Sequence, residues 1–138
     1  METRKSVNEI CELLTDYGIS PTQQRIRIAQ VLCSEARHLS AEQILDEVNQ
    51  EKIQVSKATI YNTLNLFANK GLIREVIVDP SKIFYDSTTH SHFHFYNENS
   101  GELIDIPADS LSLESLPQVP AGTALAGVDI VVRIRNNP

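Results

Sequence analysis

The chain has 138 residues, of which 41% are hydrophobic, and it carries a net charge of −6 at pH 7. This is enough apolar material for one domain or two small ones, whereas no apolar run approaches a membrane span and the first residues lack the apolar core of a signal peptide. With only two unclustered cysteines, Cys11 and Cys33, there is no disulfide framework and no Cys-x-x-Cys metal site, so we expect buried thiols in a reduced, cytoplasmic protein.

Two helices are expected near the start of the chain. Apolar residues recur at helical spacing behind the capping residue Ser6, and Gly18 provides a stop. A second helix is expected after Thr22, with Ile26, Ile28 and Leu32 among its apolar positions.

Two more helices are expected before residue 71. Ser40 and Gln43 form a capping box, in which each side chain satisfies a backbone donor of the other at a helix start. Ser56 caps a fourth helix over residues 57–70, which ends at Gly71 because glycine tolerates positive φ.

A two-stranded hairpin is expected after the fourth helix. Its strands are residues 72–78 and 83–86, and Pro80 lies in the turn between them. Helices followed by such a hairpin predict a winged helix-turn-helix, in which the helix after Ser56 is the recognition helix and the hairpin is the wing.

The second half of the chain is predicted to be a small sheet with little core of its own. Three strands and a connection with at most one short helix are expected. Since such a sheet cannot bury itself, it should pack against a partner. The strands are residues 92–97, 102–106 and 128–135, and the connection is residues 107–127.

These elements predict an α+β fold with two domains. A winged helix-turn-helix DNA-binding domain covers residues 1–86, and a small α/β dimerisation domain covers residues 87–138. Residues 1–82 carry ten Lys and Arg against eleven Asp and Glu, whereas residues 83–138 carry two against seven. The first part can therefore still present a local basic surface, and a divalent cation would offset some of the acidity of the second.

The expected recognition helix has one polar face suited to DNA. Lys57 can contact a phosphate, Tyr61 can press on a thymine methyl group or bind a phosphate, and Asn62 can read adenine. The polar start of the second helix, which includes Gln23 and Arg27, is expected to contact the sugar-phosphate backbone of the DNA. The opposite, apolar face of the recognition helix is expected to consist of Ala58, Ile60, Leu64 and Phe67. The candidate DNA-binding residues are Ser20, Gln24, Arg25, Lys57, Thr59, Tyr61 and Asn62.

Three of the four histidines lie within five residues of one another, at positions 90, 92 and 94. On a strand, His92 and His94 project from the same face while Phe93 and Phe95 pack on the other. Two imidazoles with a carboxylate one segment upstream suit Zn, Fe, Mn or Ni. The alternative is a polar, partly solvated strand edge.

Two other classes of protein compete with a metal-responsive DNA-binding protein. His92, His94 and Glu98 match the first metal motif of a cupin-type protein, but that fold needs about eight strands and a later histidine, and none follows His94. No nucleophile–base set or Gly-rich phosphate loop occurs, so we expect no enzyme. The third reading is a winged-helix protein regulated by protein contact, with the histidines as a structural or pH-sensitive cluster.

Seven segments resemble the ferric uptake regulator family in order and spacing, and they extend over nearly the whole chain. The resemblance implies a homodimer that binds double-stranded DNA operators in a metal-dependent way, usually as a repressor. The segments are residues 18–25, 38–42, 58–64, 71–73, 84–86, 92–94 and 101–105.

The resemblance also implies a regulatory metal site between the two domains. One Fe(II), Mn(II) or Zn(II) ion per chain suits its imidazoles and carboxylates. Asp86 stands where the family usually has Glu. Carried over by position, the ligands are His38, Asp86, His92, His94 and Asp105.

Two further metal sites of the family are expected to be missing. Asn97 and Ser100 occupy the places of the first cysteine pair of its structural zinc site, so no Cys-ligated zinc is expected. Ser91 and Phe93 replace the His and Asp of its second sensory site.

The end of the chain, residues 128–135, and the short connection before it resemble the iron response regulator branch of the family. That branch is associated with iron and haem status, so haem ligation by His90, His92 or His94 is an alternative. The function expected is therefore an iron-responsive repressor whose interdomain metal site sets the DNA-competent geometry of the dimer, or else a haem-responsive regulator.

Overall fold

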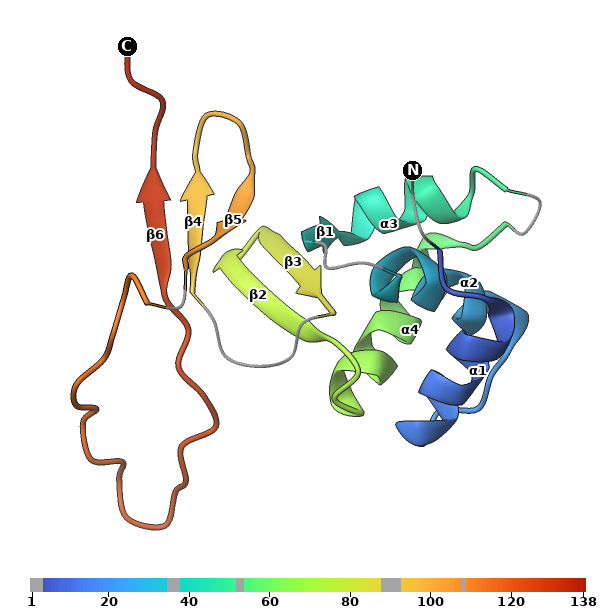
Figure 1. Ribbon diagram of the computed structural model, residues 1–138, viewed down its shortest axis with the longest axis horizontal. Coiled ribbons are helices and arrows are strands. Elements are labelled where there is room, and N and C mark those ends of the chain that lie inside the picture. The colour runs from blue at the N-terminus through green and yellow to red at the C-terminus, as the bar shows by residue number, and fades with distance from the viewer. Residues whose placement is uncertain (1–3, 35–37, 52–53, 88–92, 108) are drawn as a thin grey trace. The chain divides into compact units, whose positions relative to one another are not determined.

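The computed structural model describes residues 4–34, 38–51, 54–87, 93–107 and 109–138. The chain forms two compact units, Met1–Thr89 and His90–Pro138 (Figure 1). None of the helices among these residues is long and apolar enough to cross a membrane.

The first unit begins with two helices at the predicted capping residues. Helix α1 (Val7–Asp16) follows Ser6, whose side chain accepts a bond from the Glu9 backbone N–H while the Glu9 carboxylate accepts one from Ser6 N–H. Helix α2 (Gln23–Cys33) follows Thr22, whose hydroxyl accepts a bond from Arg25 N–H. Both predicted starts are confirmed.

The next helices, α3 (Ala41–Val48) and α4 (Lys57–Asn69), also begin as predicted. The capping box of Ser40 and Gln43 is complete, and the Ser56 hydroxyl accepts a bond from Thr59 N–H. Gly71 has φ of 80°, a conformation that favours glycine after a helix end.

The wing consists of β2 (Arg74–Asp79) and β3 (Lys82–Asp86), which pair in antiparallel fashion. The Asp79 carboxylate accepts a bond from Ser81 N–H at 2.8 Å and so closes the turn. A third strand, β1 (His38–Ser40), pairs with β3 and was not predicted from the sequence. The sheet order is β1-β3-β2, and β1 continues directly into α3.

The helices and the inner side of the wing enclose one hydrophobic core. It includes Ile60, Leu64 and Phe67, which lie on one side of α4 as predicted, but Ala58 is exposed and Thr63 is buried instead. The prediction that Ala58 belongs to this face is wrong because a residue two positions before Ile60 points about 200° away from it around the helix.

The second unit is a three-stranded sheet of order β5-β4-β6. Strands β4 (His94–Asn97) and β5 (Leu103–Asp105) are antiparallel, whereas β6 (Val131–Ile134) runs parallel to β4. All three are shorter than predicted, and residues 109–127 contain no helix. With the helical winged unit before it, this sheet gives the predicted α+β fold.

Side chains from the β4–β5 turn bind the residues that follow β6. The Asn97 side chain donates to the Asn136 side chain at 2.8 Å, and the Asn99 side chain accepts from the Asn136 backbone N–H at 2.7 Å. Arg135 forms an ion pair with Glu98 at 3.0 Å. We call the set of Asn97, Asn99 and Asn136 the asparagine clasp. Of these three residues, Asn97 occupies one of the two places where the family resemblance puts the first cysteine pair.

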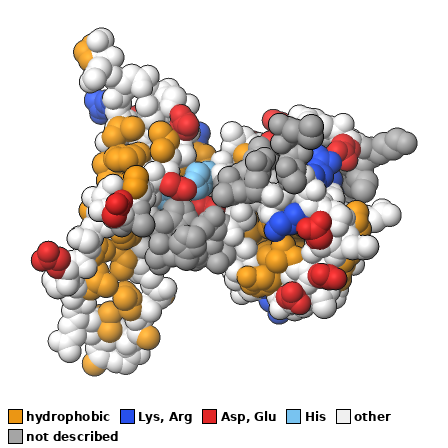
Figure 2. All heavy atoms as spheres, in the orientation of Figure 1, with side chains coloured by type: hydrophobic (Ala, Val, Ile, Leu, Met, Phe, Trp, Pro, Cys, Tyr) orange, Lys and Arg blue, Asp and Glu red, His pale blue; other side chains and the backbone are white. Residues whose placement is uncertain are grey.

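The second unit buries few apolar side chains and exposes many. Of its apolar residues, Leu103 and Ile106 are buried. Figure 2 shows hydrophobic side chains gathered along the face of this unit that is in view. Its exposed large apolar residues are Ile104, Leu113, Leu116, Val119, Leu125 and Val132.

Candidate metal ligands and nucleic-acid interface

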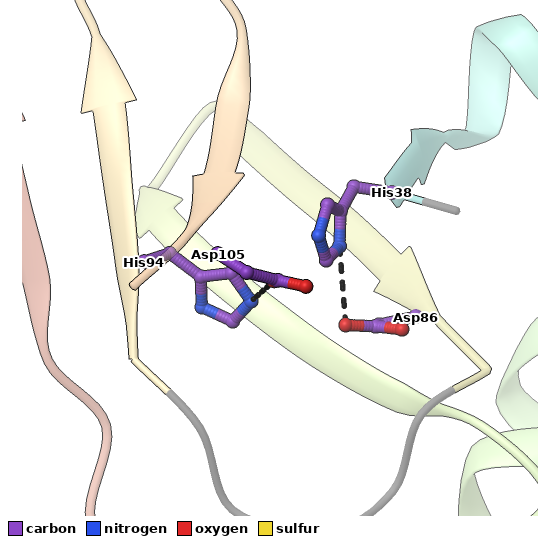
Figure 3. A group of neighbouring side chains, drawn as sticks. All are labelled: His38, Asp86, His94 and Asp105. Carbon is purple, nitrogen blue, oxygen red and sulfur yellow. Dashed lines mark ion pairs between the residues drawn. The ribbon is translucent and has the colours of Figure 1, made fainter. Parts of the chain in front are cut away.

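In the first unit, strand register places His38 directly opposite Asp86. His38 Nδ1 lies 3.1 Å from Asp86 Oδ2, and the Asp86 side chain is only 1% exposed (Figure 3). A buried carboxylate is costly unless a charged or hydrogen-bonding group faces it, so the imidazole is an important neighbour of Asp86. We call these two residues the β1–β3 pair.

The second unit contains a pair built in the same way. His94 on β4 lies opposite Asp105 on β5, and its Nε2 atom is 3.3 Å from Asp105 Oδ1 (Figure 3). The imidazole is 2% exposed, whereas the carboxylate is 58% exposed. We call these residues the β4–β5 pair.

Each pair has the chemistry of a partial metal site. Each offers one imidazole nitrogen and one carboxylate oxygen within about 3 Å of each other, a donor combination suited to Fe(II), Mn(II) or Zn(II). A slip of one residue in either strand register would send the paired side chains to opposite faces of the sheet, so the folded sheets preorganise these donors. The predicted ligand His92 and the haem candidate His90 lie outside the described residues.

The predicted DNA-binding residues of two helices line one groove. This groove, with a volume of about 570 Å³, lies between the start of α2 and the first two turns of α4. Four of the predicted residues line it: Gln24, Arg25, Thr59 and Asn62. Its other lining residues are Thr22, Gln23 and Thr63. Sequence reasoning used Thr22 only to mark the start of a helix, and it did not propose Thr63 as a DNA contact.

Tyr61 and Lys57 lie on the exposed side of α4. The Tyr61 hydroxyl donates to Glu42 Oε1 on α3 at 3.2 Å, and Lys57 Nζ lies 6.0 Å from the centre of the Tyr61 ring. Partial desolvation and the Glu42 carboxylate raise the pKa of Tyr61. Glu42 was not predicted to take part, because a glutamate in the first turn of a helix is unremarkable in sequence.

Arg27 does not belong to the DNA-contacting surface expected from the sequence. It is only 4% exposed, and its guanidinium donates to the Glu47 carbonyl at 3.0 Å and lies 3.4 Å from the Glu51 carboxylate. Arg4 binds the same carboxylate at 2.7 Å. Arg27 therefore joins α2 to the end of α3, and its predicted role as a phosphate contact is wrong.

Comparison with known proteins gives consistent matches. The sequence profile of the ferric uptake regulator family matches residues 16–130. The peroxide-responsive repressor PerR of Staphylococcus aureus (strain Mu50 / ATCC 700699) is 33% identical over 106 residues, which are 76% of this chain and 72% of that repressor.

Solved structures share the fold at lower identity. The ferric uptake regulator of Vibrio cholerae has a TM-score of 0.70 at 22% identity, over 91% of this chain and 98% of that one. A zinc-bound manganese uptake regulator has a TM-score of 0.67 at 20% identity, over 93% and 98%.

Proposed function

Since the chain belongs to the ferric uptake regulator family of metal-responsive transcription regulators, we propose that it is a repressor that binds operator DNA as a homodimer when a divalent metal ion is bound. Members of the family are regulators and not enzymes, which confirms the prediction that the chain has no catalytic function. In this proposal residues 1–86 bind DNA, and residues 87–138 dimerise and sense metal.

The metal ligands in this proposal come from both pairs. His38 and Asp86 would hold the ion from the winged unit, and His94 and Asp105 would hold it from the sheet unit, with His92 as a further ligand. The observation that carries this assignment is that each pair is a cross-strand imidazole–carboxylate combination with at least one nearly buried member. An ion bound by these groups would bring positive charge to the most acidic part of the chain and would require neutral imidazoles and ionised carboxylates.

Binding one ion with ligands from both units would restrict the angle between them. In a twofold dimer, that angle sets the separation of the two α4 helices, which must match successive major grooves about 34–36 Å apart. The ion would therefore favour the DNA-competent arrangement among those the chain can adopt, without touching DNA itself.

We propose Fe(II) as the physiological ion. The similarity of residues 128–135 to the iron response regulator branch supports this choice. Mn(II) and Zn(II) fit the same donors and are the alternatives that metal analysis separates.

The test combines metal analysis with DNA binding. Purified dimer should contain one divalent ion per chain, and a chelator should abolish binding to a duplex selected from a random pool by the metal-loaded protein. His38→Ala should weaken metal-dependent DNA binding at least about 10-fold to 100-fold. Replacing a residue that only hydrogen-bonds to a metal ligand already lowers metal affinity or activity by about this factor. Circular dichroism and light scattering must show that the variant is a folded dimer, because His38→Ala removes an imidazole that faces the buried Asp86 carboxylate.

Two control variants make this test specific. Asp109→Ala changes an exposed carboxylate close in sequence to Asp105 and should leave metal dependence intact. His90→Ala should also be neutral for the metal response, whereas a haem-responsive regulator could lose a Soret band with this variant. Unaltered metal dependence in His38→Ala protein would show that the two pairs do not act together.

A further inference from the structure

We propose that Glu42 is a positioning residue, which holds the side chain of Tyr61 so that its ring, and not its hydroxyl group, is presented to DNA. This inference rests on the proposed DNA-binding function and concerns a residue of α3, the helix before the recognition helix. Its basis is the hydrogen bond that joins these two helices at their exposed surface.

The contact restrains a side chain that is otherwise free to move. Tyr61 is 37% exposed on α4, and a solvent-facing tyrosine can adopt several rotamers. Its hydroxyl donates to Glu42 Oε1 at 3.2 Å, across nineteen residues of sequence. Lys57, one turn earlier on α4, lies 6.0 Å from the ring centre. The ring is therefore located by a carboxylate at its hydroxyl end and an ammonium group near its face.

Glu42 is itself held in place. It lies in the first turn of α3, two residues after Ser40, whose hydroxyl and backbone complete the capping box with Gln43. Ser40 pairs with Phe84 in the sheet, so the start of α3 is fixed to the wing. The helix N-terminus also favours a negative charge at this position. The carboxylate is thus a suitable anchor for a neighbouring side chain.

A second tyrosine, Tyr85, lies near Glu42 and Tyr61. The pKa of the buried Tyr85 on β3 is raised by desolvation first, then by Glu75, Tyr61 and Glu42. Tyr85 of the wing is therefore close enough to Glu42 of α3 and Tyr61 of α4 for both to affect its pKa. The Tyr61 hydroxyl donates to the Glu42 carboxylate, which is an unfavourable place from which to bind a phosphate.

This arrangement has a consequence for specificity. A carboxylate near the DNA surface repels phosphates and so lowers affinity for every sequence. By occupying the hydroxyl, however, it leaves the ring carbons of Tyr61 as the group that reaches the base edges, where apolar contacts discriminate. Glu42 should therefore raise the ratio of specific to non-specific binding even though it does not raise affinity itself.

The experiment measures the ratio of specific to non-specific DNA affinity. Fluorescence anisotropy gives both affinities, with a selected duplex and a scrambled duplex of equal length. Glu42→Ala should lower the ratio by about threefold to tenfold, the range of one hydrogen bond, with non-specific affinity unchanged or increased. Glu42→Gln should retain most of the ratio because its amide oxygen can still accept. Tyr61→Phe removes the donor, so Glu42→Ala should have no further effect on the ratio in that background.

A matched control and a second readout keep the result interpretable. Glu12→Ala, at an exposed glutamate of α1, should leave the ratio unchanged. Alkaline ultraviolet titration should show the Tyr61 transition, identified as the one missing in Tyr61→Phe protein, move to lower pH in Glu42→Ala protein. A general loss of structure would alter other tyrosines as well.

Two outcomes would overturn the proposal in distinguishable ways. If Glu42→Ala changes neither the ratio nor the titration, Glu42 is an ordinary surface residue although the protein binds DNA. If the wild-type protein selects no duplex at all, the proposed function fails and takes the DNA-reading role of Glu42 with it. The titration would then still report whether the contact itself exists.

Discussion

At the scale of single residues, burial gives the two cysteines different chemistry. Cys33 is 8% exposed, and burial raises its pKa from 9.0 to about 11, with a small opposing effect of Lys5. Cys11 is only partly buried, so the prediction that both thiols are buried is correct for one of them. Since the thiolate is the reactive form, Cys33 should be unreactive in the folded protein.

This difference gives a prediction that alkylation and mass spectrometry can check. At pH 8, iodoacetamide should label Cys11 in the native protein and label Cys33 only after unfolding. The raised folded-state pKa also means that the contribution of Cys33 to stability is fully present below pH 9 and is lost as the pH rises toward about 11. Rapid labelling of Cys33 in native protein at pH 8 would contradict the buried assignment.

Tyr61 is the second residue whose role is open to direct measurement. Tyr61→Ala should weaken binding to the selected duplex by about 1–3 kcal/mol if the ring contacts a base edge. Tyr17→Ala, at a tyrosine of similar exposure at the end of α1, is the control and should have little effect. Unchanged affinity in a Tyr61→Ala protein that still dimerises would remove this residue from the interface.

At the scale of elements, the side chains of Asn49 and Gln54 stabilise the described part of the link between α3 and α4. The Asn49 amide donates to the Val55 carbonyl at 3.1 Å and accepts from Val55 N–H at 2.8 Å, so it mimics a strand partner across the connection. The Gln54 side chain adds a bond to the Asn49 carbonyl at 3.1 Å. Asn49 therefore holds Val55, which comes just before the Ser56 cap of α4.

Asn49→Ala should lower the free energy of unfolding by about 1–3 kcal/mol, because it leaves two part-buried backbone groups of Val55 without their partners. Urea denaturation followed by circular dichroism measures this change. Asn8→Ala on the exposed side of α1 should stay within about 0.5 kcal/mol of the wild type. Equal stabilities for the two variants would show that the turn is held by other contacts.

Sequence was sufficient for elements whose signals are local. Ser6, Thr22, Ser40 and Ser56 each carry the hydroxyl that caps the next helix, so those starts could be read within four residues of sequence. Strand β1 could not be read in this way. It has three residues with one buried apolar side chain, and it exists because β3, more than forty residues later, offers it a partner.

In the candidate site, too, some features could be predicted from the sequence and others depend on contacts between distant residues. Family resemblance was enough to suggest His38, Asp86, His94 and Asp105, and register then pairs them within each sheet. Neither the burial of Arg27 nor the bond from Tyr61 to Glu42 has a local sequence signal, because both depend on how helices pack against one another. Polar residues on helices are therefore the least predictable part of such a site.

At the scale of the whole molecule, the exposed apolar side chains of the second unit favour self-association. We predict a homodimer through residues 93–135, since a three-stranded sheet with such a surface cannot bury itself. Light scattering at micromolar concentration should give twice the chain mass, and Val132→Asp should shift the protein toward monomer. Val7→Asp, at an exposed valine of α1, is the matched control. A folded wild-type monomer under these conditions would rule out this interface.

The asparagine clasp has a consequence for how the proposed regulator behaves when its metal ion is scarce. Its contacts consist of amide and backbone groups, so neither a chelator nor an oxidant has any atom there to attack. Because amide and backbone groups hold the β4–β5 turn to Asn136, these contacts should persist when the regulatory ion dissociates. Under the proposed function, metal-free protein would keep this part of the second unit folded, and repression would resume when the ion returns without new protein synthesis.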